Sequence, residues 1–246
     1  MATLFLSDLH LSAVRPDKLG LFFAVLAAAP YKVATVYVLG DLFEFWLGDD
    51  DDTPEYAEVV RRLGALTRQG VALKVTPGNR DFLLGERFAA ATGAEILPDY
   101  HVAELDGERH LLAHGDLLCT RDLNYQAFRR YVWDPQNRRT YLALPLAARR
   151  QIAADTRNGT VSSMLTKDEN IMDVDEDTVQ AVMREHGVRR FVHGHTHRPA
   201  IHDFDLDGAP ARRFVLGEWY GGSVLGLHAG GELRLLSAEE FIAAPA

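Results

Sequence analysis

Cysteine is nearly absent from this chain, which has one, Cys119, in 246 residues. No disulfide can form within the chain, and this composition fits a reducing compartment. No apolar run approaches the roughly 18 residues of a membrane-spanning helix. A basic stretch before the first apolar run is also missing, so residues 1–7 are expected to form a buried strand rather than a secretion signal. These absences together predict a cytoplasmic protein.

The chain also has fewer positively charged than negatively charged residues. Lys and Arg number 26 against 35 Asp and Glu, which gives a formal net charge of -9. Because affinity for a nucleic-acid backbone comes mainly from clustered Lys and Arg, this balance argues against a nucleic-acid binder. No feature of the sequence indicates a protein partner. Hydrophobic residues make up 47% of the chain, enough for the core of a single domain over residues 1–246.

Short apolar runs that end in polar residues alternate with helical patterns along most of the chain. Such runs are typical of strands buried on both faces, and their alternation with helices predicts an α/β fold. Thr53 is the expected N-cap of the second helix, with Pro at the first helical position. The predicted strands are Leu4–Ser7, Val33–Leu39, Val71–Thr76, Leu111–Ala113 and Phe191–Val192, and the predicted helices are Asp17–Ala29 and Pro54–Gln69.

The C-terminal part has a different pattern, in which Asp-Gly and Gly-Gly pairs separate short apolar runs. Such pairs are typical of tight turns between antiparallel strands. We therefore expect antiparallel hairpins in a second sheet. Their predicted strands are Ile201–Asp205, Arg212–Leu216, Ser223–His228 and Glu232–Leu236.

Residues 122–170 have no clear strand, and we expect them to form a helical insertion that covers the site as a lid. Residues 121–157 hold eight Arg and three Asp, a local charge of +5 in an acidic protein. The aromatic and aliphatic side chains of the same segment either pack its helices together or bind an apolar ligand. The acidic run Asp49–Asp52 is interpreted as a solvated loop.

Five short motifs are spread over almost the whole chain, and each falls just after a predicted strand, where open α/β sheets place their ligands. Each motif is common by chance, whereas the ordered set is specific. Together they supply three carboxylate or amide oxygens and four imidazoles, enough to hold two divalent cations. The motifs are Asp8-Leu9-His10, Gly40-Asp41, Gly78-Asn79-Arg80-Asp81, His114-Gly115 and Gly194-His195-Thr196-His197.

Residues two apart in an extended strand point to the same side, so the Asp-x-His and His-x-His pairs are each expected to face one way. Asp41 is the expected bridging carboxylate. Mixed nitrogen and oxygen ligation favours Mn, Fe, Co or Zn over Ca, and two such ions activate water for attack on a phosphoester. His101 and His193 are interpreted as structural. The predicted ligands are Asp8, His10, Asp41 and His197 for one ion, and Asp41, Asn79, His114 and His195 for the other.

Arg80 follows Asn79 in the third motif. An Arg cannot donate a proton at physiological pH, but it can clamp phosphate oxygens. An alkoxide leaving group needs a proton, whereas a phosphate leaving group does not, because its own second pKa is about 6. Arg80 therefore favours cleavage of a pyrophosphate. The alternative is that Arg80 only pairs with Asp81 or another acid.

The ordered motifs resemble those of the calcineurin-like metallophosphoesterase superfamily, most members of which have His at the position of Arg80. Longer motifs narrow the resemblance to the UDP-2,3-diacylglucosamine hydrolase family of lipid A biosynthesis, over essentially the full length. The resemblance implies an αββα sandwich, with two mixed sheets flanked by helices and a helical lid at 122–170. The motifs that carry it lie at residues 7–11, 40–50, 78–85, 114–120, 122–129, 171–174 and 193–199.

The resemblance also implies an activity. Water attacks the α-phosphorus of UDP-2,3-diacylglucosamine, a lipid-linked UDP-sugar, to give UMP and 2,3-diacylglucosamine 1-phosphate (lipid X). Two Mn²⁺ ions are expected, or other divalent metals in their place. The implied location is peripheral, on the cytoplasmic face of the inner membrane. The apolar, Arg-rich insertion suits both acyl chains and anionic headgroups.

The resemblance carries roles over to single positions. Thr160 stands where Ser is usual and keeps a hydroxyl, whereas Met164 stands where a polar residue is usual and loses a hydrogen-bond donor. The implied catalytic residues are Asp41, Asn79, Arg80, His114 and His195, and the implied substrate contacts are Asn79, Arg80, Asp122, Thr160, Met164, Lys167 and His195.

Two other functions fit parts of the pattern. One is a phosphodiesterase for cyclic nucleotides or a pyrophosphatase for lipid-free nucleotide sugars, and the composition of the insertion argues against both. The other is a non-catalytic scaffold. A scaffold is expected to have lost metal ligands, whereas all seven candidates are present.

Overall fold

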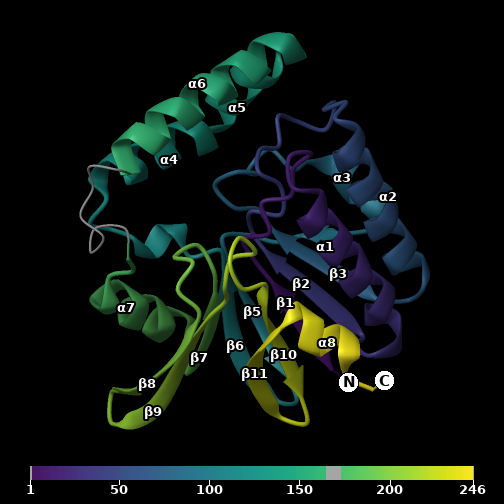
Figure 1. The fold of residues 1–246 in the computed structure, drawn as a ribbon. Coiled ribbons are helices and arrows are strands. Elements are labelled where there is room, and N and C mark those ends of the chain that lie inside the picture. Colours follow the sequence, from purple (N-terminus) through teal and green to yellow (C-terminus); the bar gives the residue numbers. More distant parts are fainter. Residues whose placement is uncertain (1, 165–172, 246) are drawn as a thin grey trace.

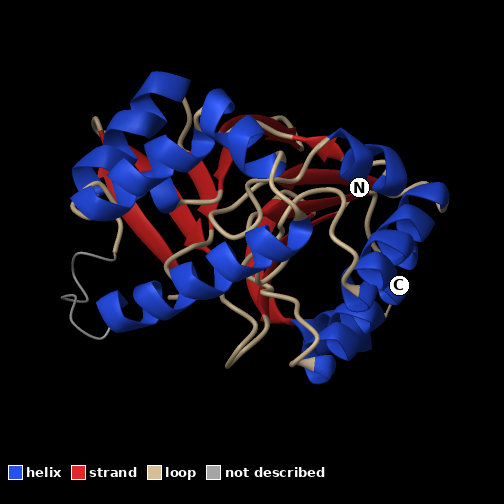
Figure 2. Ribbon diagram, turned by 90° about the horizontal axis from the view of Figure 1, so that it is seen from above, coloured by secondary structure: helices blue, strands red, loops and turns tan. Residues whose placement is uncertain are grey.

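The computed structural model describes residues 2–164 and 173–245, with side chains described for 2–156 and 173–245. Two mixed β-sheets pack face to face, and helices cover their outer faces (Figures 1 and 2). The first sheet runs, in order across it, β11 (Glu232–Ser237), β10 (Val224–Ala229), β1 (Thr3–Leu6), β2 (Thr35–Leu39), β3 (Ala72–Thr76) and β4 (Glu95–Ile96). The second runs β5 (Tyr100–Leu105), β6 (Glu108–Ala113), β7 (Arg190–His193), β9 (Ala209–Val215) and β8 (Ala200–Leu206).

The central strands of both sheets, among them β1, β2 and β7, are buried on both faces, which explains their nearly continuous apolar runs. Phe5 and Leu39 of the first sheet pack against Leu112 and Val192 of the second. Helices cover the outer face of the first sheet, and one helix covers the second. The covering helices are α1 (Pro16–Ala28), α2 (Pro54–Arg68), α3 (Glu86–Thr92) and α8 (Ala238–Ala243) on the first sheet and α7 (Glu176–His186) on the second. The predicted αββα sandwich is confirmed.

Parallel pairing brings the loops that carry the motifs to one edge of the sandwich. β1 pairs parallel with β2, and β2 with β3, while β6 pairs parallel with β7 in the second sheet. The carboxyl ends of these strands therefore meet at the same end of the molecule, below the separate group of helices in Figure 1. Two short 3₁₀ helices, η1 (Ala29–Tyr31) and η2 (Asp116–Leu118), complete the loops.

The expectation that all the C-terminal hairpins belong to a second sheet is wrong. The β8–β9 hairpin joins the second sheet, where β9 runs parallel to β7. The β10–β11 hairpin instead extends the first sheet, where β10 pairs antiparallel with β1. Local pattern predicts strands and turns, but any open sheet edge offers the same backbone hydrogen bonds. Only the packing of the whole chain selects the edge.

The β5–β6 hairpin is longer than the sequence pattern predicts, since only Leu111–Ala113 was expected as a strand. Its turn is Asp106-Gly107, with φ of 47° and 83°. Asp207-Gly208 in the β8–β9 turn has nearly the same geometry, with φ of 54° and 79°. Two consecutive positive φ values define the hairpin turn for which Asp-Gly is favoured. The Asp-Gly pair at 106–107 is therefore the signal that predicts this hairpin.

The helical insertion consists of α4 (Leu123–Trp133), α5 (Pro135–Leu142) and α6 (Leu146–Met164), which lie over the carboxyl ends of the strands (Figure 1). α4 is joined to the body by Arg129, whose Nε lies 2.6 Å from Asp116 and whose second nitrogen lies 2.7 Å from Asp99. None of the helices of the described segments is long and apolar enough to cross a membrane.

Asp49–Asp52 lie in a loop as predicted, and the Asp50 and Asp52 side chains are 49% and 72% exposed, but the acidic run also has structural roles. The Asp49 carboxylate accepts backbone N–H bonds of 2.9–3.1 Å at the start of α3, so it caps that helix. Asp50 accepts hydrogen bonds from Arg149, and Asp52 from Arg150, both on α6. The acidic run therefore ties the far end of the insertion to the body, a long-range pairing that composition does not reveal.

The prediction that Thr53 is the N-cap of α2 is confirmed, although its side chain makes no capping bond to the helix. Thr53 does occupy the N-cap position and Pro54 the first helical position. However, its hydroxyl donates to the Asp51 carboxylate at 2.7 Å and makes no bond to the helix. The Thr53 hydroxyl thus donates to an ionised carboxylate rather than accepting a backbone N–H of the helix, and hydrogen bonds to ionised groups are the stronger ones.

Candidate metal centre

The candidate ligands on the loops adopt a backbone conformation that extended strands do not have. Asp8 and His10 have φ of 54° and 48°, Asp41 has 53°, and His195 and His197 have 68° and 56°. Neither i, i+2 pair is therefore extended. Asp8 and His10 nevertheless converge on one group, as predicted, whereas the expectation that His195 and His197 face one way is wrong. Left-handed conformations cost roughly 1–3 kcal/mol at a residue other than Gly, and such strain is concentrated at functional sites.

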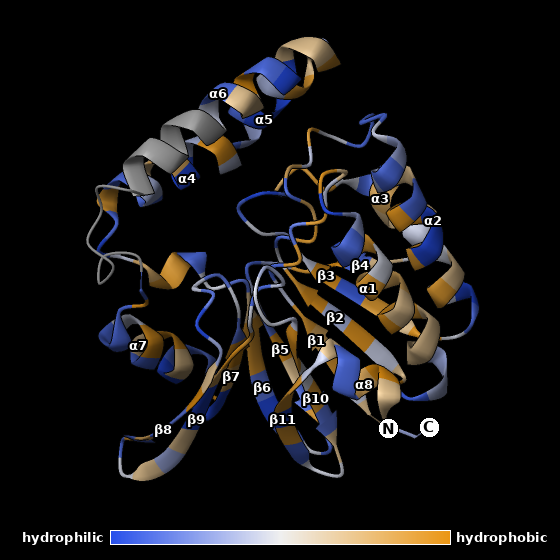
Figure 3. Ribbon diagram, viewed as in Figure 1, coloured by the Kyte–Doolittle hydropathy of each residue, from blue (hydrophilic) through white to orange (hydrophobic). Residues whose placement is uncertain are grey.

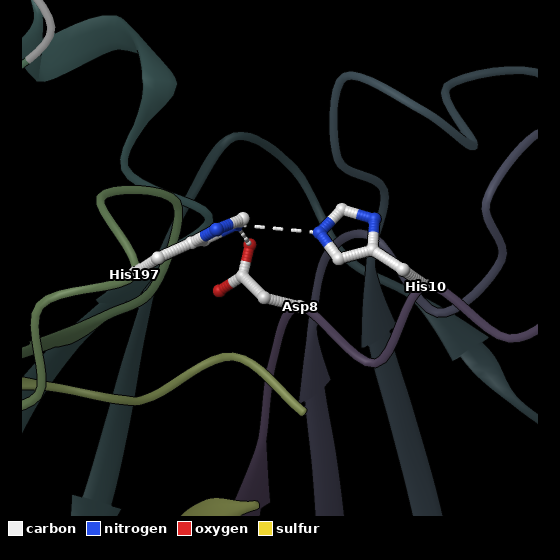
Figure 4. A group of neighbouring side chains, drawn as sticks. All are labelled: Asp8, His10 and His197. Carbon is white, nitrogen blue, oxygen red and sulfur yellow. Dashed lines mark hydrogen bonds and ion pairs between the residues drawn. The ribbon is translucent and has the colours of Figure 1, made fainter. Parts of the chain in front are cut away.

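Asp8, His10 and His197 form one group of converging side chains, drawn in Figure 4. The Nε2 atoms of His10 and His197 are 3.2 Å apart, and His197 Nε2 lies 3.4 Å from Asp8 Oδ1. Two imidazole nitrogens this close to each other and to a carboxylate match the spacing of atoms that share one cation. This is the set predicted for the first ion, apart from Asp41.

Asn79, His114 and His195 form a second group on the other side of Asp41. Asn79 Oδ1 lies 2.9 Å from His114 Nε2 and 3.0 Å from His195 Nδ1, and the two ring nitrogens are 3.2 Å apart. His195 and His197 therefore serve different groups although only one residue separates them. Because both residues have positive φ, the backbone turns between them and the two rings point to different groups.

Asp41 lies between the two groups and offers one oxygen to each. Its Oδ2 is 3.9 Å from His10 Nε2, and its Oδ1 is 3.7 Å from His114 Nε2. Asp41 Oδ1 also accepts the backbone N–H of Arg80 at 2.8 Å, which orients the carboxylate. A carboxylate placed in this way suits the bridging position that the sequence predicts for it.

Burial and close charges shift the titration of these groups. Burial raises the pKa of Asp41 to about 7, and it lowers the pKa of His10 to about 3 and that of His195 to about 4. Burial also favours neutral His114, but the Asp41 and Asp8 carboxylates outweigh it and raise its pKa to about 9. Burial thus keeps His10 and His195 neutral, the form that binds a metal, whereas a cation at this centre would displace a proton from His114.

Asp8 provides a direct test of whether a cation fits. Its Oδ2 accepts the backbone N–H of His195 at 2.8 Å. Its Oδ1 is fully buried and accepts no hydrogen bond from any residue with a described side chain. An unpartnered buried carboxylate oxygen is costly in free energy, and a divalent cation at this point removes that cost. The residues present therefore fit a divalent metal centre.

Asp81 and Gly194 support the ligands, although the sequence assigned them no such role. The Asp81 carboxylate accepts backbone N–H bonds of 2.7 Å from Gly78 and Leu42, which joins the second and third motif loops. A Cβ atom on Gly194 would stand 2.2 Å from Asp8 Oδ2, so only glycine fits there. Asp81 and Gly194 each belong to one of the five motifs. Membership of a motif is the only sequence signal that they support the ligands.

Asp81 is thus engaged by backbone groups, and the alternative in which Arg80 pairs with Asp81 is wrong. The Arg80 guanidinium instead lies 5.2 Å from the centre of the Phe45 ring. No ion pair of Arg80 is found with any acid of the described segments. The buried His193 donates its Nδ1–H to the carbonyl oxygen of Gly194 at 2.9 Å, in keeping with its interpretation as structural.

One cavity of about 630 Å³ connects the metal centre with the insertion. Its inner end is lined by Asn79, Arg80, His195 and His197. Figure 3 shows hydrophobic loops of the body beneath the insertion. The rest of the lining is largely aromatic and aliphatic, and includes Phe45, Trp46, Phe82, Leu83, Tyr125, Phe128, Tyr131, Val132, Tyr141, Leu144 and Ile152.

The predicted substrate contacts of the insertion are described only in part. Asp122 lines the cavity and also accepts the backbone N–H of Tyr125 at 3.0 Å, as the N-cap of α4. The side chains of Thr160 and Met164, and the whole of Lys167, lie outside the described residues. Their roles stay predictions.

Known proteins resemble this chain over most of its length. The calcineurin-like phosphoesterase family matches residues 1–199. A curated protein of Aeromonas hydrophila subsp. hydrophila, named UDP-2,3-diacylglucosamine hydrolase, is 51% identical over 96% of this chain and 98% of its own. Proteins of the same name from Salmonella typhi and Aromatoleum aromaticum are 46% and 47% identical over 89% of this chain, and over 92% and 90% of theirs.

A solved structure shares the fold at much lower sequence similarity. It is described as a novel archaeal phosphodiesterase, with a TM-score of 0.50 and 15% identity over 96% of this chain and 99% of that one. The curated relatives are far more similar in sequence than this structure is, and they show the family. This chain belongs to the calcineurin-like phosphoesterases and, within them, to the family whose curated members are named UDP-2,3-diacylglucosamine hydrolase.

Proposed function

We propose that this protein hydrolyses the pyrophosphate bond of UDP-2,3-diacylglucosamine in lipid A biosynthesis. Water attacks the α-phosphorus, and the products are UMP and 2,3-diacylglucosamine 1-phosphate. Relatives that are 46–51% identical carry the name of this activity.

The observation that supports the proposal most directly is that one cavity runs from the metal centre to the apolar wall under the insertion. Its inner end presents Asn79, Arg80 and His195, which suit a pyrophosphate, and its larger part is apolar. Acyl chains bury apolar surface there, at roughly 25 cal/mol per Å². A nucleotide sugar without acyl chains leaves that surface uncovered. The cavity therefore favours a lipid-linked substrate over a lipid-free one.

Arg80 and Asn79 act on the phosphates at the mouth of the cavity. Arg80 stays charged and binds the oxygens of the departing sugar phosphate, whose low second pKa makes a proton donor unnecessary. The backbone N–H of Arg80 orients Asp41, so binding of the leaving group and orientation of the bridging carboxylate come from one residue. Two divalent cations at this centre supply an activated water and neutralise the charge that develops on phosphate.

The metals are Mn²⁺, and the protein lies peripherally on the cytoplasmic face of the inner membrane. Mixed imidazole and carboxylate ligands support manganese among the metals that such a set binds. Leu123 and Tyr131 of the insertion are 76% and 64% exposed; Arg130 directly precedes Tyr131, and Arg121 lies two residues before Leu123. Apolar side chains beside Arg are typical of surfaces that bind anionic membranes.

Turnover of UDP-2,3-diacylglucosamine with Mn²⁺, and after complete metal removal, tests the reaction. Run in ¹⁸O-labelled water, it should place one labelled oxygen in UMP, as read by mass spectrometry. Label in the sugar phosphate instead contradicts attack at the α-phosphorus, and turnover that survives metal removal contradicts a metal mechanism. UDP-N-acetylglucosamine is the matched lipid-free control, and we expect kcat/KM to be at least about 100-fold lower for it.

Flotation with lipid vesicles tests the proposed location. The protein should float with vesicles that contain phosphatidylglycerol and stay behind with vesicles of phosphatidylcholine alone. Arg130→Glu should weaken flotation in low salt. Equal recovery with both kinds of vesicle contradicts a basic membrane surface.

A further inference from the structure

Tyr220 is an aromatic side chain that reaches the metal centre but not the lipid cavity. Its ring centre lies 5.7 Å from that of His10, and the residue is 46% exposed. Its hydroxyl donates to Glu44 Oε2 at 2.8 Å, and its backbone N–H donates to Glu218. The ring is thus held in place beside a metal ligand while much of it stays open to solvent.

Lys18, near the start of α1, supports the Tyr220 ring from within. Its Nζ lies 2.9 Å from the ring centre, and Lys18 is only 2% exposed. Within the described part of the chain, the ammonium group has no hydrogen-bond partner. A cation over the face of an aromatic ring is attracted to it, but a buried ammonium group without an acceptor is costly. Local arrangements that lower stability without a structural gain are most often found at functional sites.

Arg15 also lies near the same ring, with its guanidinium carbon 5.4 Å from the ring centre, and its charge is paired with the Asp17 carboxylate at 2.6 Å. The Glu44 carboxylate connects this cluster to the metal centre, since its Oε2 lies 3.9 Å from His10 Nδ1. None of the cluster residues Arg15, Lys18, Glu44 and Tyr220 lines the lipid cavity. The metal centre therefore has a second flank that presents a half-exposed aromatic ring held by charged side chains.

The proposed reaction requires a second binding region. The α-phosphorus joins a nucleoside to the lipid-linked sugar phosphate, and the lipid half occupies the cavity under the insertion. The nucleoside half must therefore leave the metal centre along another flank. A planar base needs an aromatic or guanidinium surface, because stacking on such a surface is a general way to bind a base.

We propose that Tyr220, positioned by Lys18 and Glu44, binds the nucleoside half of the substrate by stacking against the base. This inference rests on the proposed function and adds to it the site of the uridine. Lys18 and Glu44 are positioning residues, since they act through the Tyr220 ring. The products then bind on separate flanks, with UMP against Tyr220 and the sugar phosphate in the cavity.

Product inhibition of the Mn²⁺-loaded enzyme by UMP and by 2,3-diacylglucosamine 1-phosphate tests the assignment. Tyr220→Ala should raise the inhibition constant of UMP about tenfold and change that of the sugar phosphate less than about twofold. Phe128→Ala, on the wall of the lipid cavity, should show the reverse pattern. Tyr220→Phe should keep UMP inhibition within about threefold of the parent, because the ring remains. Lys18→Met should raise KM without lowering kcat.

The controls distinguish a binding role from a structural one. Equal weakening of both products by Tyr220→Ala, or loss of bound manganese in that variant, overturns the inference in favour of support for the metal centre. A Tyr220→Phe variant as weak as Tyr220→Ala overturns stacking in favour of the Glu44 hydrogen bond. Absence of turnover by the parent enzyme contradicts the proposed function, whereas normal turnover with unchanged UMP inhibition in Tyr220→Ala contradicts this inference alone.

Discussion

The metal centre and the helical insertion are held in opposite ways. In the metal centre, mostly buried side chains from several loops lie 2.9–3.9 Å apart and are constrained by strained turns and backbone hydrogen bonds. The insertion contacts the body through ion pairs of Arg129 on α4 and of Arg149 and Arg150 on α6. Tyr125 and Gln126 of α4 add hydrogen bonds to Asp116. The middle helix of the insertion, α5, has no buried residue.

This difference follows from what each region binds. Two cations and a reacting phosphate require ligand atoms within a few tenths of an ångström of their positions, so the loops that hold them must be rigid. Acyl chains require only a dry apolar wall, which tolerates adjustment. A few polar contacts are enough to position such a wall. The aromatic side chains that line it need not pack as tightly as side chains in a protein core.

Loss of a ligand in the rigid region should have the largest effect. His114→Ala removes an imidazole next to Asp41 and Asn79, and we expect kcat/KM to fall about 1,000-fold, since several kcal/mol of charge stabilisation is lost. Metal content measured by mass spectrometry should fall by about one ion. His101→Ala is the matched control, because His101 is only half-buried and outside the centre. Full metal content in His114→Ala would refute the assignment.

Arg80 joins the two regions, and its replacement should have the next largest effect. Arg80→Ala should lower kcat/KM about 100-fold with unchanged metal content, since a charged clamp on the leaving phosphate is lost while the ligands stay. Arg80→Lys should recover only part of the activity, because an ammonium group cannot reproduce the planar fork. Complete rescue by Lys would show that charge alone matters at this position.

The ion pairs of α6 offer a matched pair of variants in the adaptable region. Arg149 is buried, with only 1% of its surface exposed, and bonds Asp50 and the carbonyl oxygens of Leu47 and Leu144. Arg149→Met should lower the free energy of unfolding by about 2 kcal/mol and raise KM for the lipid substrate about tenfold. Arg150→Met should change both much less, because surface ion pairs contribute about 0–1 kcal/mol.

Thermal unfolding and steady-state kinetics of the Arg149→Met and Arg150→Met variants measure this contrast. Equal effects would mean that the insertion is held by net charge rather than by the buried contact. A rise in KM for UDP-N-acetylglucosamine as large as that for the lipid substrate would show that Arg149 supports the metal centre rather than the lipid wall.

The smallest expected effect is a change in the alkylation rate of Cys119, which measures how readily the insertion opens. Cys119 is 2% exposed and lines the cavity, and burial raises the pKa of its thiol to about 12. Because the thiolate is the reactive form, alkylation at neutral pH should be far slower than for a free cysteine. Arg149→Met should accelerate alkylation a few-fold, as followed by mass spectrometry. Fast labelling of the parent protein would mean that the insertion opens readily.

Much of the fold and of the candidate site is predictable from the sequence, because the signals are local. Apolar runs that end in Asp8, Asp41 and Asn79 indicate both the buried strands and the ligands that follow them. The family resemblance carried by the longer motifs is confirmed by the comparisons. The turn geometry at His195 and His197 was not predictable, because an i, i+2 spacing is the same in a strand and in a tight turn.

Long-range contacts account for what the sequence did not reveal. Asp50 and Arg149 are 99 residues apart, and nothing near either one indicates the other. Lys18 and Tyr220 are further apart still, and each has an ordinary local context. The sheet that takes the β10–β11 hairpin is likewise decided by which edge remains open once the rest has folded.

The sequence by itself determined the chemistry of this protein: the ligand types, their order, the Arg beside them and an apolar, basic insertion. These are properties of short segments, and a short segment carries its residue types and its strand or helix preference with it. Only the tertiary structure decided which ligands share a group, how the insertion is tied to the body, and that Tyr220 and Lys18 meet beside His10. Such juxtapositions depend on the mutual packing of distant segments, which no local pattern encodes.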